Sequence, residues 1–117
     1  KTIKHYKKIA QIYDKLIDNK NISLPLKGLA DCVYLRYPIL VKNPKRLSQL
    51  AKKQGIILGD WYSTPIAPAD INLSRTDYQP GQCPNAELLA SQSVNLPTDR
   101  QISESDVERI VKFINSF

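Results

Sequence analysis

The segment Cys32–Leu58, with the sequence CVYLRYPILVKNPKRLSQLAKKQGIIL, decides how the chain folds. Residues 32–41 are rich in β-branched and aromatic side chains, which predicts a strand with at least one buried face. Pro38 lies inside this run and has no N–H to donate to a ladder. We therefore expect Pro38 at a bulge or along an edge of the sheet.

The second half of the segment predicts a helix and another strand. Asn43 followed by Pro44 is typical of a helix start, because Asn caps free N–H groups and Pro fits the first turn. Gly55 is placed to end this helix in a left-handed turn. Residues 56–58 follow as a short buried strand. The order strand, helix, strand has the length of a split β-α-β unit.

The rest of the chain adds helices around this unit and one long irregular region. Apolar residues at three-to-four spacing predict an amphipathic helix over 2–18. Residues 59–81 read as a loop, and a loop this long in a compact domain is usually functional or packed on something else. A helix is expected to begin at Pro84, and its apolar face is formed by Ala86, Leu88, Leu89 and Ala90. Residues 94–97 read as a short extended stretch. Ser103 is expected to cap the final helix, with Asp106 in a variant of the capping box.

The length and charge indicate one small domain. At 117 residues the chain has the size of a single α+β domain. Its apolar runs fall far short of the roughly 20 residues of a membrane span. Residues 1–53 carry 13 Lys or Arg against three Asp, whereas residues 54–117 carry four against eight acids. This asymmetry fits a nucleic-acid face, a solvated helix surface or a surface that meets another domain, but the basic half lacks the interleaved aromatic residues of an RNA-reading sheet.

No constellation of residues predicts an autonomous active site. His5 lies beside the apolar stripe of a lysine-rich helix, where a structural role is favoured over that of a general base. Cys32 and Cys83 have no partners at metal-ligand spacing, and two small buried thiols in a cytoplasmic protein are favoured over a disulfide. Asp60 and Asp70 flank the loop, and either polar contacts to a ligand or turn formation would explain their presence there. The sequence contains no Gly-rich phosphate loop and no nucleophile elbow.

The order of the elements resembles the C-terminal small domain of the DegT/DnrJ/StrS family of pyridoxal-phosphate aminotransferases. The resemblance covers essentially the whole chain, and the order and spacing of the motifs carry it together. The matching pieces are Tyr34–Val41, Arg46 with Leu50, Gly55-Ile56, Tyr62 with Pro65-Ile66, Pro84-Asn85-Ala86-Glu87, Leu96-Pro97, and the stripe ending in Val111 and Ile114.

This resemblance implies a fold-type-I architecture in which the small, mostly antiparallel sheet packs against helices. Residues 1–117 would be one C-terminal domain, and a larger domain absent from this chain would bind pyridoxal phosphate and carry the Schiff-base lysine. The full-length enzyme would be a cytoplasmic homodimer that aminates nucleotide-linked keto-sugars for polysaccharide or lipopolysaccharide synthesis. We assign no catalytic or cofactor-binding residue to the chain and expect it to be inactive alone.

The resemblance also implies where substrate would be met. Many sugar-aminotransferase members read His-Tyr-Pro-x-Pro-Leu-His after the Gly-Ile strand, whereas this chain reads Trp61-Tyr62-Ser63-Thr64-Pro65-Ile66-Ala67. The two histidine positions are thus Trp61 and Ala67. We predict Trp61, Tyr62 and Thr64 as substrate-binding residues, with Trp61 either stacking on a sugar or base or filling the domain interface. The alternative from another class of protein is a stand-alone regulatory or binding module whose basic face takes an anionic ligand or nucleic acid.

Overall fold

The computed structural model describes residues 1–29, 31–66 and 70–117. Four α-helices, three strands and a 3₁₀ helix form within these residues. In chain order they are α1 (Thr2–Leu16), β1 (Ile22–Ser23), β2 (Tyr37–Val41), α2 (Pro44–Lys53), η1 (Leu73–Arg75), α3 (Pro84–Gln92), β3 (Ser93–Leu96) and α4 (Glu104–Ser116). No helix in the described ranges is long and apolar enough to cross a membrane.

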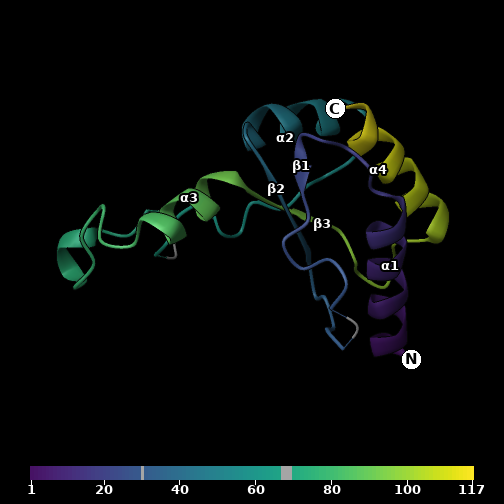
Figure 1. Cartoon of the computed structure of the whole chain (residues 1–117), viewed down its shortest axis with the longest axis horizontal. Coiled ribbons are helices and arrows are strands. Elements are labelled where there is room, and N and C mark those ends of the chain that lie inside the picture. Colours follow the sequence, from purple (N-terminus) through teal and green to yellow (C-terminus); the bar gives the residue numbers. More distant parts are fainter. Residues whose placement is uncertain (30, 67–69) are drawn as a thin grey trace.

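The three strands form one antiparallel sheet in the order β1-β2-β3 (Figure 1). This confirms the α+β fold with a small antiparallel sheet. Pro38 pairs with Asn95 of β3, but the register of β1 ends where Ser23 meets Leu40. Pro38 therefore lies beyond the end of β1, on a side of the central strand that is open there. Because β2 is the central strand and its register with β3 is unbroken, Pro38 lies neither on an edge strand nor at a bulge, and that expectation is corrected.

Three sequence predictions about strands are corrected by the structure. The strand predicted over 32–41 is β2, which begins only at Tyr37, and residues 32–36 are irregular. Residues 56–58 form no strand, so the split β-α-β unit is not completed. Ile56 is nevertheless buried, so its apolar side chain packs in the core although residues 56–58 pair with no strand. Gly59 then forms an isolated bridge with Asn95, through two backbone hydrogen bonds of 2.9 and 2.8 Å.

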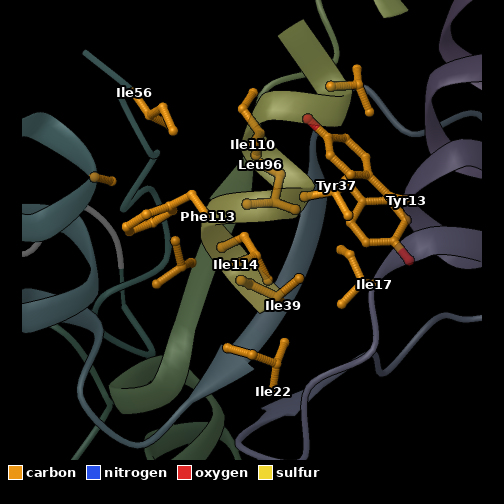
Figure 2. Close-up of a cluster of buried hydrophobic side chains, with 14 of the residues drawn as sticks. Tyr13, Ile17, Ile22, Tyr37, Ile39, Ile56, Leu96, Ile110, Phe113 and Ile114 are labelled. Atoms are coloured by element: carbon orange, nitrogen blue, oxygen red, sulfur yellow. The ribbon is translucent and has the colours of Figure 1, made fainter. Parts of the chain in front are cut away.

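The core lies between one face of the sheet and the helices α1 and α4 (Figure 2). β2 alternates between buried and half-buried residues, as expected of a strand with one face on a core. Tyr13 and Tyr37 lie in this core with ring centroids 5.0 Å apart. The Tyr13 hydroxyl donates to the Pro97 carbonyl at 2.8 Å, and the Tyr37 hydroxyl donates to Asp14. Burial raises the pKa of both phenols, so both remain neutral donors.

The helix ends follow the capping signals of the sequence. The Asn43 side chain accepts from the Arg46 N–H at 3.1 Å, and Gly55 has a φ of 72° in the left-handed region. Ser103 and Asp106 form a complete capping box at the start of α4. Hydrogen bonds from the Ser103 side chain and backbone hold the pKa of the Asp106 carboxyl below its usual value.

One segment projects away from this core. Residues 60–66 and 70–92, called the arm below, carry η1 and α3 and extend from the sheet as an elongated excursion (Figure 1). In α3 only Ala90 is buried, while Leu88 and Leu89 are 56% and 50% exposed. Apart from Ala90, the apolar face predicted for this helix is therefore exposed within the described chain.

Candidate functional site

The substrate-facing residue predicted at Trp61 lies at the base of the arm. The Gly59–Asn95 bridge fixes the start of the arm against the edge strand β3. Two residues later, the Trp61 side chain is 59% exposed. The Arg36 guanidinium lies over the Trp61 ring, with its carbon 3.7 Å from the ring centroid. This is a cation–π contact, which holds the indole in one orientation and leaves much of it open to solvent.

Arg36 and Trp61 form part of the wall of a groove of about 640 Å³. The groove runs between the segment after α2 and the N-terminal part of α4, and its charged lining residues are Arg36, Asp60, Asp99, Asp106 and Arg109. Arg109 also donates to the Gln54 carbonyl at 2.8 Å, which ties α4 to the end of α2. A groove with an aromatic wall and several polar groups is a typical small-molecule site.

The other two predicted site residues do not join Trp61 in this groove. Tyr62 is 60% exposed and lines none of the described cavities. The Thr64 hydroxyl donates to the Ile66 carbonyl at 2.7 Å, so it is engaged in the local turn. Thr64 lines a separate cavity of about 280 Å³ on the arm. The equivalent of the second family histidine, Ala67, lies outside the described residues.

That arm cavity contains a tyrosine–carboxylate pair. The Tyr78 hydroxyl donates to Glu87, and the Gly81 N–H donates to the same carboxylate oxygen at 2.6 Å. The hydrogen bond to Glu87 raises the pKa of Tyr78 to about 12, and the same bond lowers the pKa of Glu87. Near neutral pH, Tyr78 therefore keeps its proton and Glu87 keeps its negative charge. The pair stabilises the arm and is poorly suited to proton transfer.

Of the remaining candidates from the sequence, only Asp60 lines the groove. His5 Nε2 lies 2.8 Å from the Asp99 carbonyl, a contact that ties α1 to the turn before α4. Cys32 and Cys83 are both free thiols, but Cys32 is half-buried and Cys83 is exposed, so the prediction of two buried thiols is wrong. Cys83 precedes α3, an arm helix with little cover, which explains its exposure. Asp70 is exposed and Asp60 lines the groove.

The groove offers an aromatic face and charged side chains that can contact a ligand. Within the described ranges, no group of three or more His, Cys, Asp or Glu is placed to hold a metal ion. Sequence reasoning missed Arg36, because it falls inside a run that reads as a buried strand. Arg109 was missed because a helix-face arginine is usually a solvated charge. An arginine within an otherwise apolar strand-like run is the signal that would have pointed to Arg36.

Comparison with known proteins places these features in a family context. The model of the DegT/DnrJ/EryC1/StrS aminotransferase family matches residues 1–115. None of the curated proteins compared matches the chain. Among solved structures, an aminotransferase of this family from Brucella abortus is 23% identical, with a TM-score of 0.79 over 99% of this chain and 31% of its own.

Two further structures show the same fold. DesV from S. venezuelae, in complex with a ketimine intermediate, is 19% identical with a TM-score of 0.86 over 98% of this chain and 31% of its own. The sugar aminotransferase CalS13 from Micromonospora echinospora is 20% identical with a TM-score of 0.76, over 98% of this chain and 30% of its own. The chain thus spans about a third of the length of the structures that it matches.

Proposed function

The chain belongs to the DegT/DnrJ/EryC1/StrS aminotransferase family, and we propose that it is the C-terminal small domain of a sugar aminotransferase. The match over residues 1–115, combined with a share of about a third of each matched structure, carries this proposal. The substrate class that we propose is a nucleotide-linked keto-sugar. The enzyme would act in the cytoplasm as a homodimer, in polysaccharide or lipopolysaccharide biosynthesis.

The residues of this chain do not form a site for pyridoxal phosphate. A Schiff-base lysine needs an enclosed site where its ammonium loses its proton readily. The lysines here are exposed, except for the half-buried Lys7 on α1. We therefore derive no catalytic step through the cofactor from this chain, and we propose that the Schiff-base lysine lies in a separate, larger domain of the full-length enzyme.

The proposed contribution of the chain is one wall of the substrate cleft. The arm leaves the core beside Trp61, and its exposed aromatic and apolar side chains are available to another surface. Trp61 offers an indole face for stacking, and the Arg36 contact limits the rotamers of that ring. A wall that is ordered before substrate arrives helps to orient the sugar and to exclude water. Tyr62 and Thr64 would meet the substrate only at the outer end of this wall.

The test of the proposal uses the longer protein. We expect the reading frame to continue about 250 residues before Lys1 and to contain a lysine that follows a strand. That protein, mixed with pyridoxal phosphate, should develop absorbance in the near-visible range that borohydride removes. The 117-residue chain is the matched control and should show neither that absorbance nor amino transfer. A reading frame that begins near Lys1, or a longer protein without a Schiff base, would contradict the proposal.

The alternative binding module is favoured by one observation. The N-terminal half carries its excess positive charge on α1 and α2, where nearly all lysines are exposed. A single-stranded oligonucleotide titration at two salt concentrations separates the two proposals. Binding by a solvated helix surface should be weak and salt-sensitive, whereas tight binding that persists at physiological salt would favour the module.

A further inference from the structure

Arg36 lies in the groove wall without an ionic partner. Its guanidinium is stacked on the Trp61 ring, and its Nε–H is a buried donor with no acceptor within the described chain. The salt bridge that residues 1–29, 31–66 and 70–117 contain joins Lys8 to Glu104, so no carboxylate neutralises Arg36 there. Because buried donors and half-buried cations in proteins usually have partners, this arrangement needs an explanation.

Gly59 provides the space in which Arg36 reaches the indole. A Cβ built on Gly59 would lie 3.3 Å from Asn95 Cβ and 3.5 Å from Arg36 Nη1, so these side chains already fill the room that a larger residue would need. Two backbone hydrogen bonds to Asn95 hold Gly59 in place. Gly59 is not among the glycines with positive φ, so its role is to leave space rather than to allow an unusual backbone conformation.

The sheet brings these residues together from three separate segments. Asn95 of β3 pairs with Pro38 of β2 on one side and with Gly59 on the other. Arg36 precedes Pro38 by two residues, and Trp61 follows Gly59 by two residues. The contact between Arg36 and Trp61 is therefore set by strand pairing, and does not depend on the conformation of the arm beyond Trp61.

This arrangement is expected to cost stability rather than to add it. Asn95 Nδ2 is a second buried donor without a partner in the described ranges, and it belongs to the side chain that borders Gly59. An unpaired buried donor is unfavourable, and a cation–π contact on a half-exposed ring offsets only part of that cost. Both donors are sealed from solvent, so neither meets a ligand. A local conflict with stability persists most readily where it serves a site, and the Trp61 ring is the part of this cluster that the groove exposes.

We propose that Arg36 is a positioning residue, which fixes the Trp61 indole with one face covered and its exposed side presented to a ligand, and that Gly59 permits this contact. The order of the ring follows from the contacts alone, whereas the consequence for turnover rests on the proposed aminotransferase function. Arg36 acts on the substrate only through Trp61. A ring that is already ordered loses less rotamer freedom on binding, which lowers the KM.

The first experiment follows the indole in the 117-residue chain. Trp61 is its single tryptophan, so tryptophan fluorescence reports on this contact alone. Arg36→Met keeps a long side chain but removes the cation and the unpaired donor. The fast component of the anisotropy decay should grow, and acrylamide quenching should rise by up to about twofold as the second face of the ring becomes accessible. The urea midpoint, followed by circular dichroism, should stay the same or increase.

Further variants separate the contact from its two partners. Gly59→Ala removes neither partner, but its Cβ should displace Arg36 or Asn95, so Trp61 should become about as mobile as in Arg36→Met. Arg36→Lys should restore only part of the order, because an ammonium also attracts the ring but lacks the planar guanidinium. Arg46→Met is the matched control: Arg46 is exposed on α2 and does not line the groove, so the Trp61 signals should be unchanged.

The second experiment measures kinetics in the longer enzyme, with a nucleotide-linked keto-sugar as substrate. Arg36→Met should raise the KM by about threefold to fivefold with little change in kcat, because the ring must then be ordered when substrate binds. In a Trp61→Ala background the same change should have no further effect, since Arg36 then has no ring to hold.

Two results would overturn the proposal. One is an Arg36→Met chain in which the urea midpoint falls but the anisotropy and quenching of Trp61 are unchanged, which would make Arg36 a purely structural residue. The other is an equal rise in KM with and without Trp61, which would show that Arg36 meets the substrate itself. A longer enzyme that lacks amino transfer would contradict the proposed function, and the fluorescence of the 117-residue chain would still decide whether Arg36 orders the ring.

Discussion

Replacing Trp61 with Ala should clearly lower substrate turnover in the longer enzyme while it lowers the free energy of unfolding only modestly. A tryptophan that is 59% exposed keeps about two-fifths of its surface in contact with protein. For a side chain of about 250 Å², that is on the order of 100 Å², or about 2.5 kcal/mol at 25 cal/mol per Å². This is an upper value, because Ala retains part of the contact and the unfolded chain is not fully extended.

We therefore expect the free energy of unfolding to fall by about 1–2 kcal/mol, compared with about 3–5 kcal/mol for a fully buried Trp→Ala change. Urea denaturation followed by circular dichroism measures this in the 117-residue chain. Ile3→Ala is a matched control, because Ile3 on α1 is also 59% exposed. Its smaller side chain should lose less stability, and it should lose no activity.

Turnover is measured in the longer enzyme with a nucleotide-linked keto-sugar. Loss of stacking should lower kcat/KM by about tenfold, and Trp61→Phe should restore most of that loss because it keeps an aromatic face. A stability loss of 3 kcal/mol or more with an equal loss of activity would show that Trp61 fills an interface. Wild-type kcat/KM in the Ala variant would refute the stacking role outright.

Three further changes test the fold by thermal or urea unfolding. Ile114→Ala should cost about 2–5 kcal/mol, because Ile114 is fully buried under the sheet; a cost below 1 kcal/mol would mean that the core is wrongly placed. Ser103→Ala should cost about 1 kcal/mol near neutral pH. Asp106 has a lowered pKa in the folded state, so its stabilisation is present above the unfolded pKa and is lost as pH falls through the folded pKa; the Ser103→Ala penalty should shrink over that acidic range. Gly55→Ala should cost about 1 kcal/mol at a φ of 72°, with Gly81→Ala on the arm as a comparison at a φ of 87°.

The sequence predicted elements whose signals are local. Helix starts at Pro44 and Glu104 follow from caps that satisfy nearby N–H groups, so no long-range information is needed. The burial of β2 follows from its alternation and from its apolar side chains. β1 was missed because two residues, Ile22–Ser23, give no periodicity to detect.

The sequence did not predict where the arm would lie. The apolar residues of α3 read as a face for a core, but periodicity does not say which surface covers a face. In the described chain Leu88 and Leu89 are exposed. A proposed partner domain is the natural cover, because large exposed apolar surfaces mark interaction sites. Trp61 was identified through its loop, whereas Arg36 depends on a contact between residues 25 positions apart.

Both strand predictions that failed concern runs with residues in the groove, although Cys32 and Tyr34 line a separate cavity beside α1. The run 32–36 has strand-forming composition but is irregular, and it delivers Arg36 to the groove wall. Residues 56–58 also have strand-forming composition and instead line the groove, with only Gly59 bridged to the edge strand. Local preference tends to be overridden where a site imposes its own geometry. Errors of prediction without such a cause would be scattered over the chain. Each of the two mispredicted runs contributes residues to the groove beside Trp61, which favours a role in binding for this part of the fold.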